Sequence, residues 1–339
     1  MKKFIPGRMK IPEKLPEIKL TKADQRIIAE MVKNGRISAS SLAKKIGLSK
    51  EATIYRIKRL EKLDVISEYR TKVDVIPLGY RPNMVFFQTN LNPKEKEKIY
   101  DYLIEHPWVN WVSTATGKWD LLTYVMARNL NHLDRILDEI SRKIKPITYS
   151  VFSITEYLGE CLDFFELEGG FKSRPKRKTK HKVDKYDVEI LNELIKNGRA
   201  PFVKVAKKVG LSRDSVKRRV TKLKQEGIID FFYSSIHTPL LGHHWHAVIV
   251  KMVDPDKEKE FINYILNNTM NNAFFKTIGE FDFYIEVNVK SSLEFYHFIT
   301  DMMSKFGKSI INYHEMLQFG QEYFTWFPEG VYKDLLKKV

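Results

Sequence analysis

Apolar residues recur at every third or fourth position between residues 23 and 33, which is the period of an amphipathic helix packed on a core. Two shorter helices are expected to follow, over residues 39–46 and 49–62, and Ser49 stands where the N-cap of the second would lie. The next stretch, DVISEYRTKVDVI (64–76), is expected to form a two-stranded wing. Three helices followed by a wing predict a winged helix-turn-helix domain.

This pattern occurs twice in the chain. Residues 22–69 align without gaps with residues 185–232, and about a third of the aligned positions are identical. In both copies an Asn-Gly-Arg triplet follows the first helix, and we expect Gly35 and Gly198 to end that helix, with a positive φ at the C′ position. The repeat predicts two structural units of roughly 150 residues each.

The second part of each unit alternates strands and helices in the order βαββαβ. This order predicts a ferredoxin-like domain, in which a four-stranded antiparallel sheet carries both helices on one face. The other face would be rich in Phe, Tyr, Trp and Val, and we expect it to pair with the sheet of the other unit. We expect Val125 to lie on that paired face. The predicted fold class is therefore α+β, with two winged helix-turn-helix domains, two ferredoxin-like domains, and sheets paired as an intrachain pseudo-dimer.

These patterns divide the chain into six segments. They are a basic N-terminal arm (1–20), a first winged helix-turn-helix (21–76), a first ferredoxin-like domain (77–168), a basic linker (169–183), a second winged helix-turn-helix (184–238) and a second ferredoxin-like domain (239–330).

Composition narrows the range of functions. The 58 Lys and Arg against 42 Asp and Glu give a net charge of +16, which points to a polyanionic partner. The single cysteine, Cys161, excludes a disulfide framework within the chain and a Cys-rich metal site. The sequence has no apolar run of about 18 residues, and its basic start lacks the apolar segment of a secretion signal. We therefore expect a cytoplasmic protein that does not enter a membrane.

The helical stretch LTKADQRIIAEMVKNGRISASSLAKKIGLSKEATIYRIKRLEKLDVI and its second copy resemble the Lrp/AsnC family of transcription regulators. The TGKWD and IGEFD segments resemble the Gly-x-x-Asp turn of that family. The resemblance implies double-stranded DNA as the partner, with the basal transcription machinery and an amino-acid-like effector as further partners. It places the effector at Gly117, Asp120, Gly279 and Asp282. Ordinary members carry one unit per chain and dimerise through their sheets, so this chain resembles two fused members of a prokaryotic, archaeal type.

The third helix of each unit would be the recognition helix, with its outward side chains facing the DNA major groove. The predicted DNA-binding residues are Lys50, Ile54, Tyr55, Arg56, Lys58 and Arg59 in the first unit and Arg213, Lys217, Arg218, Arg219, Thr221 and Lys222 in the second. Arg56 and Arg219 share one position, next to an inner residue, and are assigned either to phosphate or to the base of the helix. Where the second unit has Lys217 and Arg218, the first has Ile54 and Tyr55. Unlike helices predict an asymmetric DNA site.

Other functions stay open beside this one. The same domains would suit an architectural chromatin protein without site preference, and the less charged first recognition helix would also suit a protein partner. Siroheme decarboxylases resemble Lrp/AsnC proteins, but WVNWVSTATGKWDLL and NAFFKTIGEFDFY lack His and Arg where those enzymes carry them. We therefore expect no enzymatic activity and no cofactor. His244 and His246 share a strand face, but no further ligands stand at a useful spacing, so no metal site is predicted. Assembly beyond the pseudo-dimer is also left open.

Overall fold

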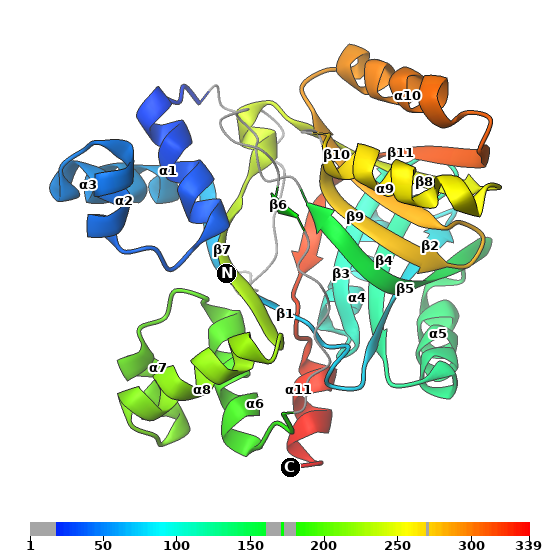
Figure 1. Ribbon diagram of the computed structural model, residues 1–339. Helices are drawn as coiled ribbons and strands as arrows, with labels where there is room; N and C mark the ends of the chain where they lie inside the picture. Colours follow the sequence, from blue (N-terminus) through cyan, green and yellow to red (C-terminus); the bar gives the residue numbers. More distant parts are fainter. Residues whose placement is uncertain (1–17, 161–170, 173–180, 269–270) are drawn as a thin grey trace.

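The computed structural model describes residues 18–160, 171–172, 181–268 and 271–339 (Figure 1). Nearly all of the predicted N-terminal arm and most of the predicted linker lie outside the described residues. The α+β fold class is confirmed, with helical domains on one side of a large sheet assembly. Among the described residues, every helix is too short or too polar to cross a bilayer.

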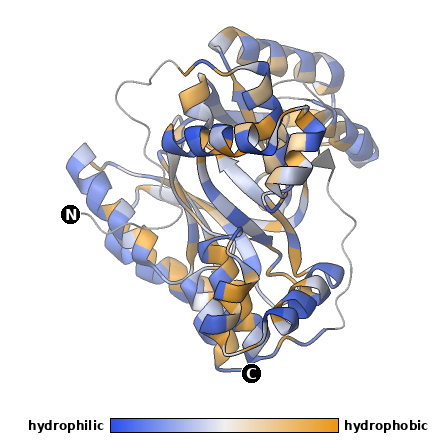
Figure 2. Cartoon of the chain, turned by 90° about the vertical axis from the view of Figure 1, so that its left-hand side faces the viewer, coloured by the Kyte–Doolittle hydropathy of each residue, from blue (hydrophilic) through white to orange (hydrophobic). Residues whose placement is uncertain are grey.

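Each unit begins with three helices, which we call its head. The first head comprises α1 (Lys22–Lys33), α2 (Ala39–Ile46) and α3 (Lys50–Lys62), and the second comprises α6 (Lys185–Lys196), α7 (Phe202–Val209) and α8 (Arg213–Gln225). The helices carry one apolar and one hydrophilic side, as Figure 2 shows. The apolar stripe predicted for the first helix is buried in both heads, with Ile27 and Ile28 in the first and Ile190 and Leu191 in the second.

The prediction of a separate two-stranded wing in each unit is wrong. Each unit contributes one strand, β1 (Ile66–Val73) or β7 (Ile229–Ile236), and these two strands pair with each other antiparallel. We call this shared pair the wing sheet. Helix α1 packs on β7 and helix α6 packs on β1, so each head rests on the strand of the other unit. The two helix-turn-helix domains therefore share a structural element.

The prediction of a positive φ at Gly35 and Gly198 is also wrong, because neither residue adopts one. Both glycines lie against the wing sheet instead. The amide of Gly35 donates to the carbonyl of Phe232 at 2.8 Å, and that of Gly198 donates to the carbonyl of Tyr69 at 2.7 Å. A Cβ atom at Gly198 would lie 2.5 Å from the carbonyl oxygen of Arg70, so the close approach of two backbones requires glycine here.

The second part of each unit is a ferredoxin-like domain. The first consists of β2 (Arg81–Gln88), α4 (Pro93–Glu105), β3 (Val109–Thr116), β4 (Leu121–Ala127), α5 (Leu130–Ile144) and β5 (Thr148–Glu160). The second consists of β8 (His244–Met252), α9 (Glu258–Leu266), β9 (Asn271–Ile278), β10 (Phe283–Val289), α10 (Ser292–Phe306) and β11 (Ile310–Phe324). In both, the first strand lies between the third and the fourth, and the second strand lies at an edge.

The two sheets join at both edges. Strand β11 pairs with β3 and strand β5 pairs with β9, so the eight strands close on themselves into a barrel. Aromatic side chains from both units fill its interior, among them Phe86, Trp119, Phe281 and Tyr284. The short strand β6 (Phe171–Lys172) pairs with β5 outside this ring. The helices cover the outside of the barrel.

Val125 does not lie on the paired face, contrary to our expectation. It packs with Ile99 and Leu103 under the helices of its own domain, whereas its neighbours Leu122 and Tyr124 point into the barrel. All seven residues of β4 are buried, because helices cover one face and the second sheet covers the other. A strand buried on both faces shows no alternation in its sequence from which its inner residues could be identified.

The chain ends in a helix that the sequence did not predict, α11 (Glu329–Leu336). Its residues Val331 and Leu335 belong to the core that α6 forms with the first ferredoxin-like domain. The hydroxyl of Tyr80 in that domain donates to Asp334 at 2.6 Å. The C-terminal helix therefore fastens the second head to the domain of the first unit.

Candidate nucleic-acid interface

The two recognition helices, α3 and α8, are fixed in the same way, by a serine N-cap and by three buried residues. The hydroxyl of Ser49 accepts the amide of Ala52, and the hydroxyl of Ser212 accepts the amide of Ser215, each at 3.1 Å. Each helix buries three residues against its own head, namely Thr53, Ile57 and Leu60 in α3 and Val216, Val220 and Leu223 in α8. This burial fixes which side chains face outward.

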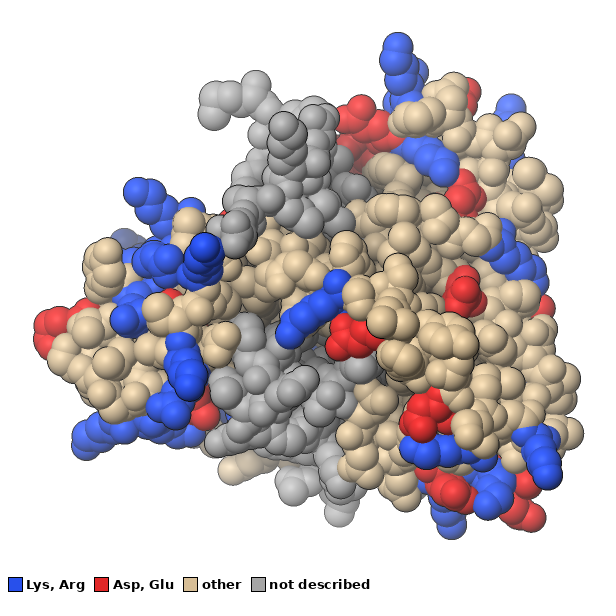
Figure 3. All heavy atoms as spheres, turned by 90° about the horizontal axis from the view of Figure 1, so that it is seen from above, with Lys and Arg blue, Asp and Glu red and all other residues tan. Residues whose placement is uncertain are grey.

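Most of the predicted DNA-binding residues do face outward. On α8, the exposed residues are Arg213, Lys217, Arg218, Thr221 and Lys222, and most of them border a shallow groove along the helix. On α3, Lys50, Tyr55 and Lys58 are exposed, whereas Ile54 and Arg59 are half-buried. Figure 3 shows Lys and Arg on both sides of the molecule, with few acidic residues among them on the side that carries the heads. Contact of these residues with DNA stays a prediction.

Arg56 and Arg219 point toward the first helix of their own heads. The guanidinium of Arg56 lies 2.9 Å from Asp24, and that of Arg219 lies 2.8 Å from Asp187. Both carboxylates are buried and close the capping box of their helix. Burial alone would raise the pKa of Asp24, but hydrogen bonds from Thr21 and Arg56 outweigh it and hold this pKa below its ordinary value. Of the two roles predicted for these arginines, the geometry supports the base of the helix.

The arginines of the two Asn-Gly-Arg triplets connect the heads to each other. The guanidinium of Arg36 donates to the carbonyls of Gly198 at 2.5 Å and Ala200 at 2.9 Å. The guanidinium of Arg199 donates in return to the carbonyl of Ile37 at 3.3 Å. Burial lowers the pKa of Arg36, and the nearby charge of Arg199 adds to this effect. Sequence reasoning missed this role, although the repeated triplet was a visible signal.

The four predicted effector residues lie in two matching turns, with Gly117 and Asp120 in one and Gly279 and Asp282 in the other. Both carboxylates bind the chain itself. Asp120 accepts the amide and the hydroxyl of Thr89, each at 2.7 Å, and Asp282 accepts the amide of Met252 at 2.9 Å. This arrangement supports a structural role for the turns, and effector binding there stays a prediction.

The histidines after the wing sheet are arranged for packing. The ring of His246 stacks on Phe295 with 3.9 Å between centroids, and His243 is buried. Burial lowers the pKa of both histidines to about 4. In the part of the chain that the structure describes, no three His, Cys, Asp or Glu side chains gather as metal ligands would.

Family models match both heads. A model described as the AsnC-type helix-turn-helix domain matches residues 183–224, and one described as a winged helix-turn-helix DNA-binding domain matches residues 20–67. The two matches fall on the two copies of the repeat, one on each head.

Curated relatives cover one unit of this chain. An uncharacterised HTH-type transcriptional regulator of Pyrococcus furiosus is 31% identical over 131 residues, which are 38% of this chain and 79% of the relative. The HTH-type transcriptional regulator Ptr1 of Methanocaldococcus jannaschii is 31% identical over 100 residues, 30% of this chain and 68% of the relative. An uncharacterised HTH-type regulator of Pyrococcus horikoshii is 28% identical over 144 residues, 42% of this chain and 95% of the relative.

One group of solved structures matches the whole two-unit arrangement. The crystal structure of the siroheme decarboxylase NirDL superposes with a TM-score of 0.63 and covers 94% of this chain and 99% of that chain. The sequence identity is 14%, so this likeness concerns the fold alone.

Proposed function

The chain belongs to the Lrp/AsnC family of DNA-binding transcription regulators, and from that premise we propose that its two recognition helices bind the two halves of one asymmetric duplex site. The observation that carries the proposal is the contrast between the outward faces of α3 and α8. The two recognition helices bury the same three positions and both have a serine N-cap, whereas their exposed positions differ in charge and in shape.

The outward residues favour different bases. Arg218 is exposed on α8 and has the planar donor pair that suits the O6 and N7 acceptors of guanine. Ile54 and Tyr55 stand at the positions that match Lys217 and Arg218, and an aliphatic side chain suits the methyl group of thymine. A homodimer presents identical helices and needs a palindrome, but a fused pair with unlike helices does not.

The contacts between the heads support a fixed distance between the two half-sites. The shared wing sheet and the hydrogen bonds of Arg36 and Arg199 hold both heads in one arrangement. Because the recognition helices then cannot move independently, the protein should prefer one spacing of half-sites over others.

Selection of binding sites from a random duplex pool at about 150 mM salt tests the proposal, because nonspecific charge binding is weak there. We expect a motif with two unlike halves at a constant spacing. The doubly substituted variant Ile54→Lys/Tyr55→Arg makes α3 more similar to α8 and should shift the motif toward a palindrome. The reciprocal variant Lys217→Ile/Arg218→Tyr is the matched control. A pool without any enriched motif would refute site-specific binding and favour an architectural chromatin protein.

The relatives support a role as a regulator rather than as an enzyme. The whole-chain fold likeness to NirDL nevertheless makes one direct check worthwhile. Incubation of the protein with siroheme should release no carbon dioxide, and turnover would refute the regulatory assignment. The basal transcription machinery as a partner, assembly beyond the pseudo-dimer and a cytoplasmic location stay predictions, which crosslinking, light scattering and cell fractionation can check.

A further inference from the structure

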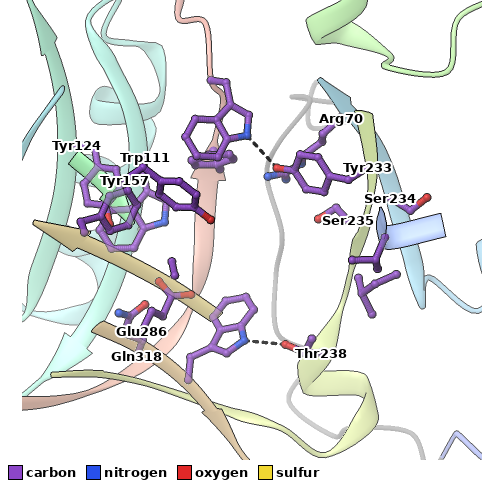
Figure 4. A pocket seen from close by; sticks show the side chains of 17 residues that line it. Arg70, Trp111, Tyr124, Tyr157, Tyr233, Ser234, Ser235, Thr238, Glu286 and Gln318 are labelled. Atoms are coloured by element: carbon purple, nitrogen blue, oxygen red, sulfur yellow. Dashed lines mark hydrogen bonds between the residues drawn. The ribbon is translucent and has the colours of Figure 1, made fainter. Parts of the chain in front are cut away.

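The second head, the wing sheet and the barrel are joined into one body, which we call the frame. The buried core of the second head includes Tyr80 of the first ferredoxin-like domain and Val331 of α11. The indole N–H of Trp326, in the segment after β11, donates to the hydroxyl of Tyr233 on β7 at 2.9 Å (Figure 4). Apolar packing and hydrogen bonding therefore both attach the wing sheet and the second head to the barrel.

The first head is attached to the frame in a different way. Among the described residues, its buried core takes Ile236 alone from the second unit. Helix α1 packs on β7, but apolar packing is non-directional and does not by itself fix the orientation of the head. Directional hydrogen bonds between α3 and the frame would fix it.

A polar bridge of this kind runs from the last turn of α3 to the second head through Tyr69 on β1. The hydroxyl of Tyr69 donates to the carboxylate of Glu61 on α3. The same hydroxyl accepts a hydrogen bond from Nη1 of Arg199 at 3.0 Å, and the guanidinium lies 4.9 Å from the centre of the Tyr69 ring. A phenol can donate and accept at once, so it bonds both charged groups together, and hydrogen bonds to charged groups are the stronger kind.

The matching positions of the second unit cannot form this bridge. Phe232 stands where the first unit has Tyr69, and Lys224 stands where it has Glu61. Phenylalanine has no hydroxyl, and an ammonium group accepts no hydrogen bond. The Lys224 ammonium instead lies 5.7 Å from the centre of the Phe232 ring. The bridge therefore belongs to the first recognition helix, whose head shares less of its core with the frame.

We propose that Tyr69 is a positioning residue that sets the orientation of α3 relative to α8, and with it how strictly the protein distinguishes between spacings of the two half-sites. Arg199 holds the ring of Tyr69, and the hydroxyl in turn holds the last turn of α3 through Glu61. Without the hydroxyl, α3 should sample several orientations against the frame. The part of this inference that concerns DNA rests on the proposed function, whereas the orientation of α3 is a property of the free protein.

Pulsed electron paramagnetic resonance between spin labels on the two recognition helices tests the orientation without DNA. Glu51 on α3 and Asp214 on α8 are exposed and occupy matching positions, so Glu51→Cys/Asp214→Cys in a chain with Cys161→Ser carries one label on each head. We expect one narrow distance distribution, which Tyr69→Phe should widen or split. Tyr186→Phe, which removes an exposed hydroxyl from α6, is the matched control and should leave it unchanged.

Equal distance distributions in Tyr69→Phe and Tyr186→Phe would overturn the proposal. If Tyr69→Phe does not fold, Glu61→Ala serves instead, because it removes the acceptor of the bridge at an exposed position of α3. It should widen the distribution in the same way, and an unchanged distribution in this variant would overturn the proposal as well.

Affinities for two DNA duplexes give the second test, one with the preferred spacing and one with the spacing changed by one base pair. Tyr69→Phe should lower the ratio of the two affinities by about tenfold, the smaller effect expected for a hydrogen bond to a charged group. A purely structural role would weaken binding to both duplexes equally, and an unchanged ratio would overturn the positioning role. A wild-type protein without any preferred spacing would contradict the proposed function instead, and the spin-label distances would still decide the role of Tyr69.

Discussion

The contact between Gly198 and the wing sheet gives the sharpest test of how the two heads are joined. Substitution of this glycine by alanine places a Cβ atom 2.5 Å from the carbonyl oxygen and 2.6 Å from the carbonyl carbon of Arg70. Both obstacles are backbone atoms of β1, so no side-chain rotation relieves the clash. An ordinary contact lies between 3.4 and 4 Å, so the two backbones must separate by roughly 1 Å.

The expected loss of stability follows from two contributions. Overpacking of this kind costs about 1–3 kcal/mol. Separation of the backbones also breaks the hydrogen bond from the Gly198 amide to the Tyr69 carbonyl, now 2.7 Å long, which contributes about 1 kcal/mol. The wing sheet of Gly198→Ala should therefore lose about 2–4 kcal/mol of local stability.

Hydrogen exchange is the suitable assay, because a chain with several domains does not unfold in one step and local protection reports the wing sheet itself. The free energy of local opening, measured from the exchange of the β1 and β7 amides, should fall by about 2–4 kcal/mol. Gly210→Ala is the matched control, since Gly210 has a φ of 70° and no atom within 4 Å of the new Cβ, and its strain stays in the second head. If wing-sheet protection in Gly198→Ala equals that in Gly210→Ala, the argument from backbone contact is refuted. In the double variant Gly35→Ala/Gly198→Ala, the second substitution should lower the local stability of the wing sheet by less than Gly35→Ala does alone, because both glycines contact the same sheet.

Four further predictions test separate parts of the molecule. Arg218→Ala should weaken specific DNA binding by about 1–3 kcal/mol in gel-shift titration and Ile54→Ala by less, and equal negligible effects would contradict the assigned faces. Leu122→Asp buries a charge inside the barrel, so the midpoint of thermal unfolding should fall sharply, and an unchanged midpoint would contradict the closed barrel. The lowered pKa of Asp24 stabilises the fold above pH 4 and this stability is lost as pH falls through the lowered value, so urea titrations of Asp24→Asn should show lower stability at pH 7 and a flatter acid limb. Burial lowers the pKa of His246 to about 4, so stability should fall between pH 6.5 and 4 on acidification, and His246→Gln should remove part of that slope.

The helical part of the fold could be predicted because its information is local. Stripes such as Ile27 and Ile28 and caps such as Ser49 lie within a few residues of the structure that they determine. The partner of a strand is a different matter, because side-chain periodicity gives its faces and says nothing of its edges. Residues 64–76 were therefore expected to form a complete two-stranded wing, whereas they contain the single strand β1, whose partner β7 belongs to the other unit.

In the candidate interface, the outward residues could be predicted from local patterns, but contacts between helices could not. The buried stripe of α8 left Arg218 facing outward, as expected. The role of Arg56 could not be decided in the same way, because its partner Asp24 lies on another helix. The capping pattern from Thr21 to Asp24 was visible in the sequence, and Asp184 and Asp187 repeat it, so a buried carboxylate beside the arginine could have been inferred.

The differences between the two units have a physical logic that fusion makes possible. In a homodimer every substitution occurs twice, so a residue that suits one side of the interface must also suit the other. The arginine contacts that join the units have stayed alike on both sides, as Arg36 and Arg199 show. The recognition helices have not, because Lys217 and Arg218 of α8 stand where α3 has Ile54 and Tyr55. Fusion therefore allows the two recognition helices to differ while these arginine contacts between the heads stay matched, which identical protomers could not do.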